Sequence, residues 1–273
     1  MQKLTQPHHQ QILNLTTENP YITLFIEGDL NLFGFNSPFQ TFHGRFKNDK
    51  LVNVVLQYRE VLNIYAKELT PADIDYITRL IPKYKIKEIA FGEQTRQLFV
   101  NYLNKFEAHE LRQTFLSVYT PNETSQPSLS ATDISLAEMR YLHPIETEVT
   151  QWQESVNEVF EVEDSSTTVA EVISDIQNKK SIINTIWQDD ELLSWATATA
   201  FTNSAAMIIG VGTKECARKN GYATMCVKKL CDDLYKEGRR AVLFYDNQVA
   251  GKIYHKLGFV DQENYYLLEL KKI

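Results

Sequence analysis

Cysteine is scarce in this chain of 273 residues. Only Cys216, Cys226 and Cys231 are present, and their spacing matches neither a disulfide framework nor a set of paired metal ligands. We therefore expect reduced thiols and no bound metal. The sequence also lacks an apolar run of membrane-spanning length, and its N-terminal region lacks the apolar segment of a signal peptide. These absences predict a cytoplasmic protein with no membrane association.

An excess of positive charge is missing as well. The chain has 28 Lys and Arg against 35 Asp and Glu, which gives a formal net charge of -7 and a pI near 5.5. Nucleic acid is not an expected partner, because a phosphate backbone attracts basic surfaces. An acidic surface suits cationic small molecules or basic peptides, although the same charge also serves solubility alone.

The composition is that of a folded protein, with 43% hydrophobic and 23% charged residues. The length favours two domains over one, since single cores usually stop growing at about 250–300 residues. Proline, serine and asparagine interrupt all periodicity in residues 121–133. We therefore expect a linker there, between domains of residues 1–120 and 134–273.

The first half alternates strand-like and helix-like segments. Pro71 marks the first turn of a helix, since proline is favoured at that position. Apolar alternation and turn residues predict the remaining elements. The expected strands are 21–27, 39–46, 51–58, 61–66, 86–91 and 112–119, and a second helix covers 93–106.

The second half has two helices, three strands and then a change of period. Helical spacing predicts helices at 145–160, 165–179, 222–236 and 247–257, where Gly238 and Gly258 end the last two. Alternation and short polar breaks predict strands at 139–143, 181–187, 192–201, 205–213, 241–245 and 265–270.

An Arg-x-x-Gly-x-Ala turn connects the strand ending at Thr213 to the next helix. Backbone amides at a helix N-terminus point outward, and the helix dipole favours negative charge there. Gly221 lets the backbone approach a pyrophosphate closely, and Arg218 and Lys219 add positive charge. The turn therefore predicts an anion site, although such spacing also occurs in ordinary tight turns.

A second motif follows one helix and one strand later. Residues 247–259 read Asn-x-x-Ala-x-x-x-Tyr-x-x-x-Gly-Phe. In this order and spacing, the two motifs resemble those of the GNAT superfamily of acyl-CoA-dependent N-acyltransferases, over roughly residues 133–273. The resemblance implies an α/β (α+β) fold. The order of elements in residues 1–120 echoes the second half. We expect tandem GNAT-like domains, each a mixed, mostly antiparallel sheet flanked by helices, with an unrelated α/β cap as the alternative for residues 1–120.

The resemblance also implies which residues bind acetyl-CoA. The strand before the turn would offer backbone groups to the pantetheine arm, the turn would hold the pyrophosphate, and Asn247 would bind the pantetheine. Thr213 departs from the usual apolar residue and Asn220 from the usual lysine or arginine. The predicted cofactor-binding residues are Val211, Thr213, Arg218, Lys219, Asn220, Gly221, Tyr222, Ala223 and Asn247.

The same resemblance places Tyr254 near the sulfur of the thioester. Direct attack by an amine needs a proton for the departing thiolate, and a phenol with a pKa near 10 is protonated at neutral pH. Tyr254 is therefore the predicted catalytic acid. Its alternative role is packing in the apolar stripe of its helix. The sequence contains no motif for the general base, and Cys216 has no identifiable histidine partner for an acyl-enzyme route.

Three functions remain open from the sequence. The first is transfer of an acetyl group from acetyl-CoA to a primary amine of a small molecule or a peptide, with a homodimer as a possible assembly. The second is a non-catalytic CoA-binding regulatory module. The third is an aminoacyl transferase that uses charged tRNA, which the intact pyrophosphate turn and the acidic pI disfavour.

Overall fold

The computed structural model describes residues 1–121, 137–161 and 167–271. It divides the chain into two compact units. Unit 1 comprises Met1–Ser117, Phe244–Gln248 and Asp261–Ile273, and unit 2 comprises Val118–Leu243 and Val249–Val260. Neither unit is one continuous stretch of sequence.

Unit 1 contains a mixed sheet and four α-helices. The strand order is β1-β2-β3-β4-β5-β12-β6, in which β4 and β5 pair in parallel and the recorded pairs β1–β2, β2–β3, β3–β4 and β5–β12 are antiparallel. The strands are β1 (Gln2–Leu4), β2 (Gln40–Lys47), β3 (Lys50–Tyr58), β4 (Val61–Ala66), β5 (Glu88–Gly92), β6 (Ala108–Tyr119) and β12 (Phe259–Leu270). The helices are α1 (His9–Thr16), α2 (Leu24–Phe33), α3 (Pro71–Tyr84) and α4 (Glu93–Phe99).

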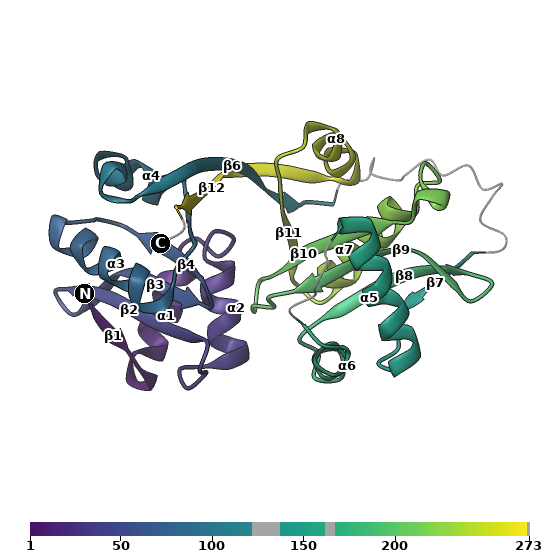
Figure 1. Cartoon of the computed structure of the whole chain (residues 1–273), viewed down its shortest axis with the longest axis horizontal. Coiled ribbons are helices and arrows are strands. Elements are labelled where there is room, and N and C mark those ends of the chain that lie inside the picture. The colour runs from purple at the N-terminus through teal and green to yellow at the C-terminus, as the bar shows by residue number, and fades with distance from the viewer. Residues whose placement is uncertain (122–136, 162–166, 272–273) are drawn as a thin grey trace. The chain divides into compact units, whose positions relative to one another are not determined.

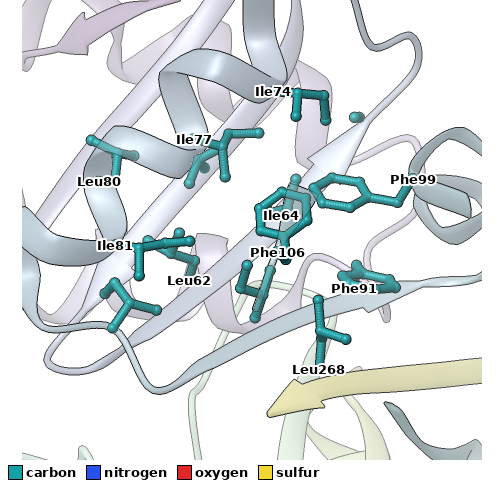
Figure 2. Close-up of a cluster of buried hydrophobic side chains, with 14 of the residues drawn as sticks. Leu62, Ile64, Ile74, Ile77, Leu80, Ile81, Phe91, Phe99, Phe106 and Leu268 are labelled. Carbon is teal, nitrogen blue, oxygen red and sulfur yellow. The ribbon is translucent and has the colours of Figure 1, made fainter. Parts of the chain in front are cut away.

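The core of unit 1 lies between α3 and the sheet (Figure 2). Ile74 and Ile77 point from α3 toward Leu62 and Ile64 of β4, and all four are at most 2% exposed. Leu268 of β12 belongs to the same cluster. The C-terminal strand therefore completes the core built by the N-terminal half, and Figure 1 shows the yellow strand β12 running beside its neighbour β6.

Unit 2 contains the sheet β11-β10-β9-β8-β7. Its first pair, β10–β11, is parallel, and the following three pairs are antiparallel. The strands are β7 (Glu138–Tyr141), β8 (Ile182–Gln188), β9 (Glu191–Thr199), β10 (Ala205–Thr213) and β11 (Arg240–Tyr245), and the helices are α5 (Glu146–Phe160), α6 (Val169–Gln177), α7 (Tyr222–Lys236) and α8 (Gln248–Leu257).

Helices pack on both faces of the unit 2 sheet. Ile183 and Trp195 belong to a buried cluster that includes Val149 of α5 and Val172 of α6. Their strand neighbours Asn184 and Ser194 point to the other face, because side chains alternate along a strand. On that face, Asn184 Nδ2 donates to the Cys226 carbonyl of α7 over 3.3 Å.

One expected strand is wrong. Residues 21–27 form a turn and the start of α2, a helix in which Leu24, Ile26 and Leu30 are buried. A short continuous apolar run shows no periodicity that would separate a buried helix from a buried strand. β1 and α1 were not expected, and the helix expected over 93–106 continues beyond α4 as a 3-10 helix at Val100–Lys105.

The two units have different bounds from the expected domains, which were residues 1–120 and 134–273. Residues 261–273 belong to unit 1, where β12 pairs with β5 from Tyr265↔Gly92 to Glu269↔Glu88. A fragment of residues 134–273 would therefore carry β12 without its partner β5. Most of the expected linker 121–133 lies outside the described residues, as does the start of the helix expected at 165–179, which is observed from Val169.

The described part of the chain contains no helix that is both long and apolar enough to cross a membrane.

Candidate acyl-CoA site

The site begins where β10 separates from β11. Their parallel pairing covers Ala205↔Arg240, Ala206↔Ala241 and Met207↔Val242, and none is recorded for the remainder of β10 among the described residues. On its other side, β10 stays paired with β9 as far as Thr213↔Ser194. Backbone groups from Ile208 onward are therefore available along one edge. An extended ligand can bind such an edge as an added strand does.

A bulge distorts β10 in this unpaired stretch. The register shifts between Ile209 and Gly212, and Gly210 has a φ of +55°, which favours glycine. A Cβ atom at Gly212 would come within 2.3 Å of Trp195 Cζ2, so the indole occupies the space of a side chain there. Sequence reasoning missed this bulge. The signal was present, because two glycines flank Val211 inside a strand.

The predicted pyrophosphate turn has the backbone of an anion site. Gly221 is the N-cap of α7 with φ +78° and no side-chain cap, and Lys219 is also left-handed at φ +69°. In the described structure, no backbone hydrogen bond is recorded from the amides of residues 219–223. Left-handed residues beside an open helix start gather amides around a concave space. This arrangement suits the oxygens of a diphosphate.

Charge around the turn has the expected sign. Arg218 and Lys219 are exposed, and Arg218 Nε donates to the Thr213 carbonyl over 3.4 Å. This bond connects the end of β10 to the turn. The structure thus brings Thr213, Arg218 and the start of α7 together.

The two departures from the family pattern have structural partners. Thr213 Oγ1 lies 2.8 Å from Ser194 Oγ, which also donates to the Gly212 carbonyl over 2.8 Å. Asn220 Nδ2 donates to the Ala217 carbonyl over 3.3 Å. Thr213 therefore contacts the serine that bonds the bulge, Asn220 bonds the backbone before the turn, and neither side chain uses a backbone amide of the turn.

A cavity of about 260 Å³ lies between the β8–β9 hairpin and the turn. Its lining includes Asp189 and Glu191, and Glu191 pairs with Lys214 over 3.2 Å. The acidic lining makes this cavity unsuited to the diphosphate itself. Cys216 also lines it and is exposed.

The other thiols are unsuited to chemistry. Cys226 and Cys231 are fully buried on α7, and all three cysteines are free. Burial raises the pKa of Cys226 to about 12 and that of Cys231 well above its ordinary value. Such thiols stay protonated at neutral pH and are poor nucleophiles.

Tyr254 lies on α8 and is partly buried, with its ring edge-on to Phe259 at 5.8 Å. Burial raises the pKa of its phenol above 10.0, so the proton stays on the oxygen at neutral pH. Tyr254 belongs to unit 2, whereas Asn247, which immediately precedes α8, belongs to unit 1. Val211 is partly exposed on the bulge, Tyr222 is buried at the first position of α7, and Ala223 follows it there.

These features define an α/β protein with an open strand edge and an uncapped helix start that suit an acyl-CoA. A family model described as GNAT acetyltransferase matches residues 93–268, more than half of the chain. The chain belongs to the GNAT acetyltransferase family. A comparison with curated proteins gave no match.

Solved structures show the same fold at low identity. A GCN5-related N-acetyltransferase from Sphaerobacter thermophilus is 13% identical, with a TM-score of 0.67 over 100% of this chain and 96% of that one. A tandem GNAT protein from the clavulanic acid biosynthesis pathway is 11% identical, with a TM-score of 0.67 over 98% and 97%. A GCN5-related N-acetyltransferase-like protein from Streptococcus suis is 13% identical, with a TM-score of 0.61 over 98% and 100%. The expected tandem GNAT fold is confirmed.

Proposed function

We propose that this protein transfers an acetyl group from acetyl-CoA to a primary amine of a small molecule or a peptide, by direct attack of the amine on the thioester. The observation that carries the proposal is the open start of α7. Its N-cap is a left-handed glycine without a side-chain cap, and it follows a strand edge that is unpaired from Ile208 onward.

The residues present fit acetyl-CoA as a substrate. Amides of residues 219–223 have no recorded backbone acceptor in the described structure, and a diphosphate supplies acceptor oxygens. Arg218 and Lys219 would add charge to that contact. Val211 and Thr213 would offer backbone groups to the pantetheine arm, and Asn247 its side chain.

Tyr254 would donate a hydrogen bond to the departing sulfur. Its raised pKa keeps the proton in place but makes the phenol a weaker acid than a thiol of pKa about 8.5. Partial donation as the sulfur gains charge therefore suits it better than complete transfer. The acyl-enzyme route through Cys216 is not part of the proposal.

The remaining expectations stay predictions. They are the cytoplasmic location, a possible homodimer, and a role for unit 1 in choosing the acceptor. The same holds for the absence of a bound metal and of a nucleic-acid or membrane partner.

The test is thiol release from acetyl-CoA with a panel of primary amines, read together with the thermal shift caused by CoA alone. Amine-dependent release together with a CoA-induced rise in Tm supports the proposal, since a ligand of the folded state stabilises it. A CoA shift without release for any amine would point to the non-catalytic regulatory module. If neither amine-dependent thiol release nor a CoA-induced rise in Tm is observed, the assignment of the acyl-CoA site is wrong.

A further inference from the structure

Helix α2 of unit 1 carries an acid between two aromatic residues. Phe25, Asp29 and Phe33 are four positions apart, so they lie on one face of the helix. All three side chains are partly exposed. A ligand can therefore reach this stripe from solvent.

Aromatic rings surround both ends of the stripe within unit 1. Phe25 stacks on Phe244 of β11 with ring centroids 5.9 Å apart and planes at 12°, and Phe244 packs against Tyr265 at 4.6 Å. At the other end, Phe33 lies edge-on to Phe39 at 5.0 Å. Ring faces attract cations.

The second aromatic group already holds a cation. Arg59 lies over the rings of Phe39 and Tyr58, at 5.7 and 5.9 Å. No cation is recorded over Phe25 or Phe244 among the residues that the structure describes. The ring pair near the start of the stripe is therefore the one that no cation of the described residues already covers.

Asp29 is a partly buried acid, and a buried carboxylate is stabilised by a cation or a hydrogen-bond donor. In the described part of the chain, no ion pair and no hydrogen bond to its carboxylate is recorded. Only its backbone carbonyl is engaged, by Gln40 Nε2 at 3.1 Å. Burial, the single cause of the shift, raises its pKa to about 7. By contrast Glu27, the other acid of α2, accepts a hydrogen bond from Thr16 over 3.1 Å.

We propose that Asp29, together with the rings of Phe25 and Phe244, binds the ammonium group of an amine carried on an aromatic or apolar skeleton. The carboxylate supplies the counter-charge and the rings supply cation–π and apolar contact. A cation of this kind compensates a carboxylate that has lost water. This inference rests on the proposed function in one respect, which is that the bound amine is the acetyl acceptor.

Phe244 links this stripe to the acyl-CoA strand pair through the sequence of β11. It follows Val242 by two positions, and Val242 is the last residue of β11 with a recorded partner in β10. The contact between Phe25 and Phe244 lies within unit 1, whereas β11 up to Leu243 is part of unit 2.

The test measures binding to the full chain without acetyl-CoA. The probes are 2-phenylethylamine and its uncharged analogue 2-phenylethanol, titrated by calorimetry at pH 8. The wild type should prefer the amine by about tenfold or more, and Asp29→Asn should remove that preference. Phe25→Leu should weaken the binding of both probes. Asp49→Asn, which removes an exposed carboxylate from the β2–β3 turn, is the matched control and should keep the preference.

Each outcome decides one statement. A wild type that binds neither probe, or an Asp29→Asn protein that is folded and still prefers the amine, overturns the site. Asp29-dependent amine binding without acetylation of any amine keeps the site and removes the proposed function. Acetylation of 2-phenylethylamine at equal kcat/KM in wild type and Asp29→Asn keeps the function and overturns the site. A lower kcat/KM for 2-phenylethylamine in Asp29→Asn than in the wild type, with unchanged CoA affinity, supports both the amine site and the proposed function.

Discussion

The link from β4 to α3 in unit 1 and the link from β10 to α7 in unit 2 occupy equivalent places in the order of elements. The first is short, since β4 ends at Ala66 and α3 begins at Pro71, while the second runs from Thr213 to Tyr222. Thr70 closes the first helix with a capping box, because its Oγ1 accepts from the Asp73 amide and Asp73 accepts from the Thr70 amide. Gly221 leaves the second helix open.

The strands before these links differ in the same sense. β4 pairs with β5 from Val61 to Ile64, and its pairing with β3 shows no register shift. β10 pairs with β11 only as far as Met207 and contains a bulge. The two units therefore share an order of elements, but unit 1 satisfies its own helix start with Thr70 and Asp73. Topology alone does not make an anion site, since the amides must also be left without partners.

Of the substitutions that test this comparison, Gly221→Glu should have the largest effect, which is a loss of CoA binding. The substitution places a strained side chain and a negative charge at the open helix start, so we expect CoA affinity to fall more than about 100-fold. Gly238→Glu is the matched control, because Gly238 has the same φ of +78° beyond the other end of α7 with no neighbour within 4 Å of its Cβ position. The thermal shift caused by CoA measures CoA binding by Gly221→Glu and by Gly238→Glu. Equal CoA affinity in the two variants would show that the turn is misassigned.

Tyr254→Phe should lower turnover by about 10- to 10,000-fold if donation to the sulfur is lost. CoA affinity should stay close to that of the wild type, because the turn is unchanged. Single-turnover kinetics separate the chemical step from product release. Tyr235→Phe on the exposed side of α7 is the control. An unchanged chemical step in Tyr254→Phe would leave Tyr254 with a packing role only.

Asp29 should make stability depend on pH between about 4 and 7. Its pKa is about 7 in the folded chain and 3.8 as an ordinary aspartate, so the folded state binds more protons in that window. Stability contributed by this group therefore falls as pH rises from 4 to 7. Asp29→Asn should be more stable than wild type at pH 8 by about 1–3 kcal/mol, below the ~4 kcal/mol of a fully buried group. Urea unfolding at pH 5 and pH 8 measures this, and an equal difference at both pH values would contradict it.

Thr70→Ala should have the smallest effect, a loss of about 1 kcal/mol from unit 1. It removes the capping box but leaves Pro71 and the short link in place. We expect no CoA binding by unit 1 in this variant, so the thermal shift with CoA should equal that of the wild type. The parallel change Thr168→Ala removes the capping box of α6 and serves as the control. A larger CoA shift in Thr70→Ala alone would mean that the cap is what closes the anion site in unit 1.

Local sequence determined the parts of the site that depend on short spacing. The turn around Gly221, the Pro71 helix and the bounds of β4, β10 and α7 follow from the residues themselves, because glycine, proline and apolar period act within a few positions. The bulge at Gly210 could also have been inferred from the two glycines in a strand.

Tertiary structure decided the rest. Residues 21–27 form a turn and the start of a helix, because burial of Leu24, Ile26 and Leu30 decides between the two structures that an apolar run permits. The placement of β12 in unit 1 depends on its pairing with β5, and no local pattern encodes a partner so distant in sequence. The contact of Phe25 on α2 with Phe244 on β11 likewise required the fold, since the two residues are far apart in the chain and meet only through packing.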